Sequence, residues 1–553
     1  MKGLKKLVSL LLVAAMCFSL VACATPGTDK NNEENNKTET NNEQTEAGKK
    51  VFRYPITADT ETLDPAMMNS ITSATLGYHI YEGLMRAHMG EVKYGLAESY
   101  DVSDDGLVYT FHLRDAKWSD GVDIKAQDFE YGIKRVADPA TASDFVFLLT
   151  NLIKNANEVN SGQLPVDELG VKAVDDKTLT IELQNPTSYF TGMLSMSVFL
   201  PVRQDIVEKY GNEFSITADK NVYCGPFVVT DWKHEDKVLL AKNENYWDKD
   251  SIKLDEVEVY TVTDPMTAVA MYEQGQLDIA QVPPEVAGNY ENVNYYFDGS
   301  NDFIKLNMDG SCELDNKDLR LAINYALNRE DYISLTSKNI YQANTRYVLP
   351  QVKGVSGEYG TEYPLEAFPV NGDAAKAKEH LDAALSALGI SDPASLELEL
   401  ITTDTDRARI EAEVIQNQLQ TTLGITVPIR QVAYKQRLQM ESDHEFEMII
   451  GGWVPDYSDP ISYLELWTSD SSYNQGSYFS DEYDALIADA RTNTDPKARM
   501  DALFNAEKLL LEDGAIVPLQ LRRIGLLINP KLKGFETYFV GLNYDYIYAD
   551  IVE

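Results

Sequence analysis

An α/β fold with mixed sheets is predicted for this chain by two observations on the residues from Val51 onward. Short strand patterns recur along the sequence, and helical patterns with one apolar face lie between them. No internal repeat is visible in the sequence. Strands and helices that alternate along a chain pack together as an α/β protein rather than as separate all-α and all-β parts.

The strand patterns are short runs rich in β-branched and aromatic residues between turn-forming segments. In order, they are VYTFHL (108–113), TLTIEL (178–183), KVLLAK (237–242), SLELELIT (395–402) and FEMII (446–450).

Two helices are predicted with defined ends. In NKDLRLAINYALNRE (316–330) the apolar residues recur at helical spacing, and Asn316 stands at the N-cap position. In DPKARMDALFNAEKLLLEDG (495–514), Asp495 is placed to cap, Pro496 occupies the first turn, and Gly514 can end the helix.

The first 50 residues are predicted to be an export signal and a tether. Residues 1–22 combine three lysines with an apolar run, and LVAC (20–23) resembles the lipobox of bacterial lipoproteins. That resemblance implies cleavage before Cys23 and lipidation of its thiol, and two acyl chains suffice for stable anchoring. Residues 23–50 are then a lipidated cysteine and a disordered tether rich in Asn, Glu, Thr and Lys.

The predicted location is therefore the extracytoplasmic face of the cell membrane, in a Gram-positive envelope. A conventional cleaved signal with a chance cysteine is the alternative reading of the same segment.

Composition excludes some partners. The 553 residues suffice for about three domains or for one large lobed unit. With 48 basic against 88 acidic residues, the net charge of −40 argues against nucleic acid and against docking on anionic lipid. No other apolar run of about 18 residues follows the signal. Cys224 and Cys312 are compatible with one disulfide or with two thiols.

Catalytic signatures are missing from the sequence. The chain has no HExxH, GxSxG, GxGxxG or GxxxxGK[ST] motif, and no SxxK after the signal. Its six histidines are scattered without the spacing of metal ligands, so we expect neither a metal site nor a cofactor. The acidic pairs Asp104–Asp105 and Asp175–Asp176 lie in turn-like settings, where no apolar surroundings would raise a carboxyl pKa as in a pair of catalytic acids.

Several segments together resemble the extracellular solute-binding proteins of family 5, which include the peptide-binding receptors of ABC importers. They are HIYEGLMR (79–86), residues 95–135, ADPATAS (137–143), residues 169–190, residues 224–248, NKDLRLAINYALNRE, and GGWVPDYSDP (451–460). Their identity, order and spacing all agree with the family.

The resemblance implies a two-lobed fold of the periplasmic-binding-protein type, with mixed sheets, an extra domain and the ligand enclosed between the lobes. Lobe I would combine residues 51–81, 205–300 and 524–553. The extra domain would be residues 82–204, and lobe II would be residues 301–523.

Asp456 is the first predicted ligand contact. In peptide-binding members, the aspartate after the tryptophan strand receives the α-amino group of the peptide. A terminal ammonium that is enclosed between two lobes loses water and needs a charged partner. From the residues alone, an aspartate before Tyr-Ser-Asp-Pro is also a good turn former, so a structural role is the alternative.

The resemblance assigns further contacts on both lobes. Gly452, Trp453 and Val454 would offer a strand edge that pairs with the peptide backbone, whatever the peptide sequence. Asn69, Ser70 and Ile71 match the opposite lobe, although Asn69 replaces an acidic residue. Phe145 stands where a tyrosine is found in the oligopeptide-binding relative, and a plain core aromatic is its alternative reading.

The carboxylate end of the peptide is assigned to Arg407, whose guanidinium suits a bidentate contact with a carboxylate. In the oligopeptide-binding relative a histidine used for longer peptides stands there. The other basic positions of that relative correspond here to Ile450 and Glu441, neither of which is basic. A solvated arginine at a helix start is the alternative for Arg407.

The sequence thus predicts a monomeric, lipid-anchored receptor that binds short peptides outside the cell and delivers them to the transmembrane subunits of an ABC permease. It is predicted not to be an enzyme. Alternatives within the family are a nickel-chelate or oligosaccharide binder and a dedicated peptide-pheromone receptor. Scattered histidines and only five tryptophans weaken the first two. A secreted hydrolase with paired carboxylates is the alternative from another class.

Overall fold

The structure, a computed structural model, describes residues 48–88, 91–150, 152–187 and 189–552. The predicted signal over residues 1–22, the lipidated Cys23 and nearly all of the predicted tether lie outside these residues. Lys49–Glu553 form one compact unit, which carries all the features below.

The first sheet has four strands in the order β1-β10-β9-β8, with β1 and β10 parallel and the other pairs antiparallel. Its strands are β1 (Val51–Ile56), β8 (Phe227–Lys233), β9 (Lys237–Lys242) and β10 (Glu256–Thr261). Every second residue of β1 is buried, as expected when one face of a sheet covers the core.

The second sheet is antiparallel, has four strands in the order β4-β5-β7-β6, and packs against α3 (Ala126–Ala137). Its strands are β4 (Ala97–Val102), β5 (Val108–Leu113), β6 (Val171–Ala173) and β7 (Thr178–Glu182). Phe111 in β5 and Phe129 in α3 are fully buried in the core between them.

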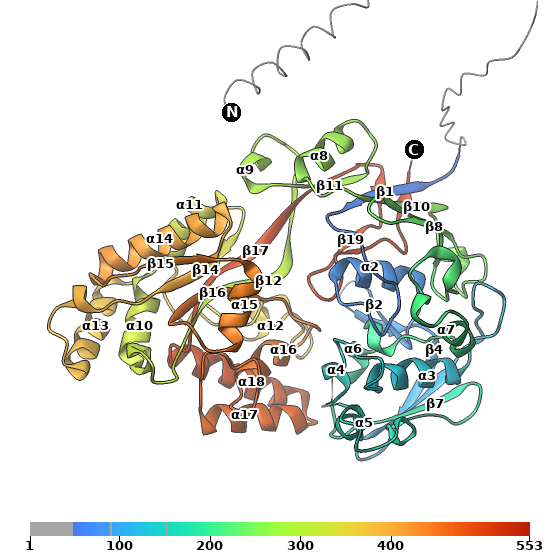
Figure 1. Cartoon of the computed structure of the whole chain (residues 1–553), viewed down its shortest axis with the longest axis horizontal. Coiled ribbons are helices and arrows are strands. Elements are labelled where there is room, and N and C mark those ends of the chain that lie inside the picture. The colour runs from blue at the N-terminus through green and yellow to red at the C-terminus, as the bar shows by residue number, and fades with distance from the viewer. Residues whose placement is uncertain (1–47, 89–90, 151, 188, 553) are drawn as a thin grey trace, which may run out of the picture. The chain divides into compact units, whose positions relative to one another are not determined.

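The third sheet has seven strands, of which six follow the order β11-β17-β12-β16-β14-β15 while β13 pairs with β17. Its strands are β11 (Ile279–Val282), β12 (Asn294–Leu306), β13 (Gln342–Ala343), β14 (Leu400–Thr403), β15 (Ile429–Val432), β16 (Met448–Trp453) and β17 (Ile516–Ile528). The two long strands β12 and β17 are antiparallel neighbours, visible side by side in Figure 1.

Both faces of the third sheet are covered. Met448 and Leu400 face the apolar cluster formed with α10 (Lys317–Ala326), α13 (Ala374–Leu388) and α14 (Asp406–Leu423). Ile449 and Ile401 point the other way, into a smaller cluster with Met440 of α15 (Tyr434–Ser442). Alternate side chains of β14 and β16 therefore serve two cores, which explains why the paired residues Leu400, Ile401, Met448 and Ile449 are all apolar.

The remaining elements surround these sheets. The helices are α2 (Ile71–Ile80), α4 (Phe147–Thr150), α5 (Ala156–Asn160), α6 (Phe190–Met193), α7 (Gln204–Tyr210), α8 (Pro265–Glu273), α9 (Pro284–Ala287), α11 (Arg329–Ser337), α12 (Tyr359–Glu362), α16 (Ile461–Leu464), α17 (Asp481–Thr492) and α18 (Pro496–Glu512). The short strands are β2 (Met85–His88), β3 (Glu91–Tyr94), β18 (Leu532–Lys533), β19 (Glu536–Thr537), β20 (Tyr544–Asp545) and β21 (Asp550–Ile551).

Most of the predicted elements are confirmed. β5 and β9 have the predicted bounds, and β7 ends one residue earlier than predicted. The predicted helix 495–514 is α18, where the Asp495 side chain accepts a hydrogen bond from the Ala498 N–H at 2.7 Å. Gly514 follows the helix with φ of +62°, a conformation that suits glycine.

Three predicted elements differ from the structure. The predicted strand 446–450 becomes β16, which begins only at Met448 and continues to Trp453. The predicted helix 316–330 is two helices, because Asn328 caps a second start by accepting from the Asp331 N–H. The predicted strand 395–402 becomes β14, which begins only at Leu400. The segment beside it contains Pro428, and the carbonyl of Pro428 accepts a hydrogen bond from the Leu400 N–H. Because proline has no N–H to donate in return, regular pairing cannot extend toward residue 395.

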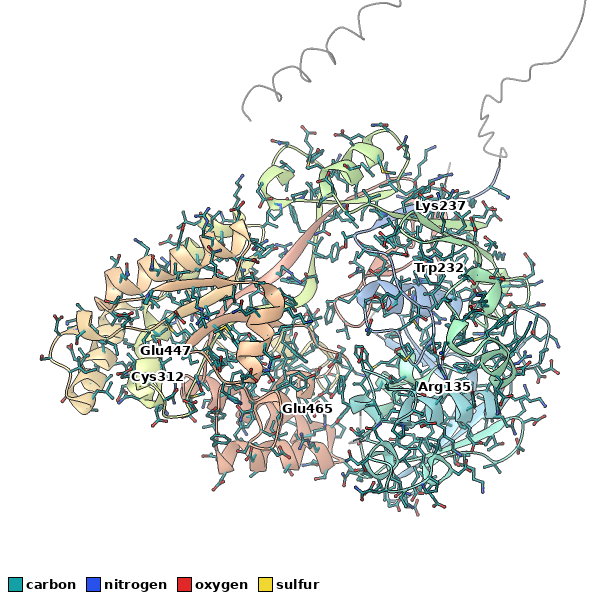
Figure 2. All side chains as sticks on the ribbon, in the orientation of Figure 1. Arg135, Trp232, Lys237, Cys312, Glu447 and Glu465 are labelled. Atoms are coloured by element: carbon teal, nitrogen blue, oxygen red, sulfur yellow. The ribbon has the colours of Figure 1, made fainter. Side chains whose placement is uncertain are left out.

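The two cysteines after the tether do not form a disulfide. Cys224 is buried and Cys312 (Figure 2) is partly buried, and both are free thiols. Within the described ranges, no helix is both long and apolar enough to cross a bilayer.

Candidate ligand-binding site

The site is built around the C-terminal half of β16, which has an open edge. On one side, β12 pairs with β16 up to Trp453, which lies opposite Asn301. On the other side, β14 pairs only with Met448 and Ile449. Among the described residues, no strand therefore pairs with Ile450–Trp453 on the β14 side. A free strand edge of this kind can accept an extended ligand by main-chain hydrogen bonds.

Gly452 lies on this edge and is exposed. A Cβ at this position would lie 2.8 Å from Oδ1 of Asp302 and 3.1 Å from the backbone oxygen of Asn301. Glycine is therefore required by close packing against β12, and it also leaves the strand edge uncovered. Gly452 and Trp453 lie on β16, and Val454 directly follows it. Their contact with a ligand stays a prediction.

Asp456 follows the strand and carries an unpaired carboxylate. Its backbone N–H donates to Oγ of Ser462 at 3.0 Å, which fixes the local chain. Within the described part of the chain, its carboxylate oxygens make neither a hydrogen bond nor an ion pair. Loss of water on burial, reinforced by the nearby charge of Glu465 (Figure 2), raises the pKa of the Asp456 carboxyl to about 6.

The turn after this segment is held by another aspartate. Oδ1 of Asp459 accepts from the N–H of Ile461 at 3.0 Å, and its carboxylate also pairs with Arg499. The turn-forming role that the sequence offered for Asp456 is performed by Asp459. The carboxylate of Asp456 remains available to a cationic group.

Trp453 is fixed next to Asp456. Its Nε1–H donates to the carbonyl of Ser462 at 3.0 Å, and its ring meets that of Tyr473 edge to face, with centroids 5.5 Å apart. Ser462 therefore holds both Trp453 and Asp456 through its backbone and its hydroxyl. This common support fixes the position of the carboxylate relative to the strand edge.

The predicted contacts from the other lobe gather at the start of α2. Asn69, Ser70 and Ile71 are exposed, and Ser70 caps the helix through its hydroxyl, which accepts from the Ser73 N–H. The Asn69 amide donates to Asp144 at 2.9 Å, next to the partly buried Phe145. The structure thus brings Asn69 and the segment of Phe145 together, and their contact with a ligand stays a prediction.

Arg407 lies in the first turn of α14 and already has protein partners. Its Nε and Nη2 both donate to Oε1 of Glu411 at 3.0 Å, and its Nη1 donates to the hydroxyl of Tyr341 at 2.6 Å. The role of Arg407 as carboxylate partner of a ligand also stays a prediction.

One group of aromatic residues was missed by sequence reasoning. Tyr189 stacks on Tyr457, with centroids 5.1 Å apart and 3° between the ring planes. The guanidinium of Arg499 also lies over the Tyr189 ring, at 5.0 Å from its centroid. Tyr189 and Tyr457 both fall in motifs that carry the resemblance, but no local pattern indicates that distant segments meet.

Comparisons with known proteins found similar sequences and similar folds. The model of "Bacterial extracellular solute-binding proteins, family 5 Middle" matches residues 91–475. The chain is 32% identical to the dipeptide-binding protein of Lactococcus lactis subsp. cremoris, over 90% of this chain and 93% of that protein. Two solved structures are also similar.

The first of these is the structure described as Listeria monocytogenes OppA bound to peptide, with 29% identity and a TM-score of 0.73 over 92% of this chain and all of that one. The second is described as the structure and mode of peptide binding of the pheromone receptor PrgZ. It is 31% identical, with a TM-score of 0.74 over 91% of this chain and all of that one.

Proposed function

This chain belongs to family 5 of the bacterial extracellular solute-binding proteins, and from this premise we propose that it is the peptide receptor of an ABC importer. It binds short peptides outside the cell and delivers them to a membrane permease. Its fold class is the two-lobed α/β fold of the periplasmic binding proteins. Relatives and structural neighbours of similar length are named for dipeptide or oligopeptide binding.

The observation that carries this function is the unpaired carboxylate of Asp456 at the end of an open strand edge. A partly buried carboxylate is costly unless a cation accompanies it. The free α-amino group of a peptide supplies that cation, and it fixes the first residue of the ligand next to Val454. Anchoring one terminus sets the register of the ligand without reading any side chain.

The edge at Gly452, Trp453 and Val454 supplies the second half of the recognition. A peptide that runs along this edge makes main-chain hydrogen bonds, which every sequence except one interrupted by proline can form. Asn69, Ser70, Ile71 and Phe145 then contact the ligand from the other lobe. Side chains of the ligand are accommodated in hydrated pockets, where water adapts to each residue.

Transport requires closure of the lobes and a partner. The ligand is enclosed by a hinge motion, in which β12 and β17 connect the two lobes. The predicted division into lobe I (51–81, 205–300, 524–553), an extra domain (82–204) and lobe II (301–523) is part of this proposal. The receptor itself performs no covalent chemistry, acts as a monomer and needs no cofactor. ATP is hydrolysed by another subunit of the importer.

The location of the receptor follows from its N-terminal sequence. Residues 1–22 direct export, and a lipid on Cys23 retains the protein at the extracytoplasmic face of the cell membrane. Mass spectrometry of the membrane-extracted protein tests this point. An N-terminal fragment that begins at a diacylglyceryl-modified Cys23 is expected, and an unmodified Cys23 in the mature protein would exclude the anchor.

A signalling role is the second candidate function, because the chain resembles the pheromone receptor structure over 91% of its length. A receptor for one dedicated peptide would bind a single sequence far more tightly than others. A general importer would bind many peptides of similar length with similar affinities. Side-chain selectivity therefore separates the two roles.

Native mass spectrometry of the soluble form from Gly48 onward tests the proposed function. The protein is offered a mixture of peptides of two to six residues, and Asp456→Ala is measured in parallel. Peptide adducts on the wild type that disappear in the variant are expected. Adducts of one sequence only would favour signalling. No adduct on either protein, or cleavage of the peptides, would contradict a peptide receptor.

A further inference from the structure

A buried group of charges lies beneath the open edge of β16. It consists of Lys305, Arg437 and Glu441, and we call it the Arg437 cluster. The side chain of Arg437 is bonded to Glu441, with 2.6 Å from Nη1 to Oε1, and Nζ of Lys305 lies 3.9 Å from Oε2 of the same carboxylate. The three residues are only 8%, 8% and 5% exposed, respectively.

The Arg437 cluster carries an excess positive charge. It contains two cations and one carboxylate, and the other contact of Lys305 is with the neutral amide of Gln475. Burial lowers the pKa of Lys305, as expected for an ammonium with too little negative charge around it. A buried excess charge is stabilised when a counter-ion joins it. The cluster therefore favours an anion, in a chain whose net charge is −40.

Arg437 also has unused hydrogen-bonding capacity. Its Nη1 donates to Glu441 and, at 3.0 Å, to the backbone carbonyl of Ile450. Its Nε is buried and has no partner among the described residues. A buried guanidinium whose donors are not all satisfied is uncommon in folded proteins. An oxygen acceptor next to this guanidinium would complete its contacts.

The guanidinium lies at the edge itself. A Cβ on Gly451 would be 3.2 Å from Nη1 of Arg437 and 3.3 Å from Oε1 of Glu441. Glycine at this position thus keeps the charged group close to the backbone of β16. The carbonyl that Arg437 binds belongs to Ile450, the first residue beyond the pairing with β14.

The length of chain between Gly451 and Asp456 sets how many ligand residues separate this guanidinium from the Asp456 carboxylate. A ligand whose amino end lies at Asp456 and which runs back along Val454, Trp453 and Gly452 advances with the strand at about 3.3 Å per residue. It reaches Gly451 after about three residues. A carboxylate at that point of the ligand meets the Arg437 cluster.

We propose that Arg437 receives a carboxylate of the ligand about three residues from its amino end, and so favours very short peptides with a free carboxyl terminus. This inference rests on the proposed peptide-binding function and adds the length and the charge of the preferred ligand. The same contact could come from an acidic side chain at that position, and the experiment separates the two sources.

Arg437 and Arg407 lie on opposite faces of the third sheet. Arg437 lies on the face of Gly451, which α15 covers. Arg407 pairs with Glu411, and Glu411 contacts Gln520. Gln520 also bonds Asp302, which lies on the face of Gly452. Among the donors of Arg407, Nε, Nη1 and Nη2 each have a partner. Arg437 is therefore the better placed of the two for a ligand that ends opposite Gly451.

The test compares the affinities of matched peptides by isothermal titration calorimetry. The ligands are tri-alanine, its C-terminal amide, and the amides of Ala-Ala-Glu and Ala-Ala-Gln. The proteins are the wild type, Arg437→Gln, Arg437→Lys and, as a matched control, Arg409→Gln. Arg409 also pairs with a glutamate four residues later, Glu413 at 2.8 Å, but on the exposed side of α14.

We expect the wild type to prefer tri-alanine over its amide by about tenfold to a hundredfold, the usual range for a hydrogen bond to a charged group. Arg437→Gln should abolish this preference, Arg437→Lys should retain part of it, and Arg409→Gln should leave it unchanged. Each preference is a ratio of two affinities that are measured on the same protein. A variant that is only partly folded would lower both affinities equally and would keep the wild-type ratio.

Three further outcomes identify the source of the carboxylate or contradict the proposed roles. If Arg437 receives an acidic side chain, Arg437→Gln will instead abolish a preference for Ala-Ala-Glu amide over Ala-Ala-Gln amide. If Arg437→Gln keeps the wild-type ratio for both pairs while peptides still bind, Arg437 has no such role. If no peptide binds to the wild type, the underlying peptide-receptor function is wrong.

Discussion

Tyr189 stacks face to face on Tyr457, the residue that directly follows Asp456, with ring centroids 5.1 Å apart. The hydroxyl of Tyr457 donates to Glu465 at 2.9 Å, and the guanidinium of Arg499 contacts the Tyr189 ring. Tyr189 belongs to the predicted extra domain, whereas the others belong to predicted lobe II. The segment that carries the unpaired carboxylate is thus in direct contact with a residue of the predicted opposite lobe.

Replacing this ring is expected to weaken peptide binding without removing a ligand contact. An aromatic stack contributes about 0.5–1.5 kcal/mol, so Tyr189→Leu should weaken affinity by about twofold to tenfold. Because the stack joins the two predicted lobes, the change should appear mainly as faster dissociation. Surface plasmon resonance on the wild type and on Tyr189→Leu measures both rates.

Tyr94→Leu is the matched control for this measurement, because Tyr94 is an exposed tyrosine of the same predicted domain. It should leave both rates unchanged. Unchanged dissociation in Tyr189→Leu would show that the stack does not contribute to closure.

Peptide affinity should depend on pH through Asp456. The pKa of its carboxyl is about 6 without ligand, and an ammonium partner favours the ionised form, so bound peptide lowers this pKa. Protonation therefore competes with binding, and the dissociation constant should rise up to tenfold for each pH unit below about 6. Above pH 6 the affinity should level off until the amino group of the peptide loses its proton.

Calorimetric titrations of tri-alanine between pH 4.5 and 7.5 check this dependence. N-acetyl tri-alanine has no ammonium and serves as the control, since its binding should not weaken on acidification. A flat profile for tri-alanine over the same range would mean that Asp456 does not titrate near pH 6.

The unpaired carboxylate should also reduce the stability of the ligand-free protein. The folded-state pKa of Asp456 lies above the usual value near 3.9, so the folded protein binds more protons and its stability falls as pH rises from about 4 to 7. Asp456→Asn removes this cost. It should stabilise the ligand-free protein at pH 8 by at most about 3 kcal/mol, since one pKa unit corresponds to about 1.4 kcal/mol.

Thermal unfolding of the wild type and Asp456→Asn without ligand, at pH 4 and pH 8, measures this effect. The melting temperature of the variant should exceed that of the wild type at pH 8, and the difference should shrink at pH 4. A less stable variant at pH 8 would mean that Asp456 has a structural partner in solution.

Main-chain pairing with β16 predicts an alternation along the ligand. In a strand pair, successive residues point their N–H groups alternately toward and away from the neighbour. Methylation of one ligand amide nitrogen should therefore reduce affinity about fivefold, while methylation of the next should have little effect, because one hydrogen bond contributes about 1 kcal/mol. Competition binding with singly N-methylated tetra-alanines reads out this pattern. Equal losses at every position would argue against pairing.

The sequence predicted the elements whose determinants are local. Asp495 and Pro496 define the start of α18. The short run VYTFHL predicts β5, in which every second residue is buried. Prediction from the sequence failed where a local signal competes with a distant one. Asn328 starts a second helix inside a continuous apolar pattern, and Pro428 shortens β14 from a neighbouring segment.

The candidate site was predicted by a different route. The role of Asp456 rests on the resemblance of the whole chain to the family, because its short motif taken alone also fits a turn. Tyr189 and Arg437 could not be found in this way. The role of Tyr189 depends on a contact with Tyr457, and that of Arg437 depends on charges from β12 and α15 that meet only in the folded chain.

The most direct test of the account is a cycle of four affinities that involves only the amino end of the ligand. Tri-alanine and N-acetyl tri-alanine are titrated into the wild type and into Asp456→Asn at pH 7.5. If Asp456 receives the α-amino group, acetylation should weaken binding to the wild type by at least tenfold and should have little effect in the variant. Equal losses on acetylation in both proteins would place the amino end of the peptide elsewhere and contradict the account.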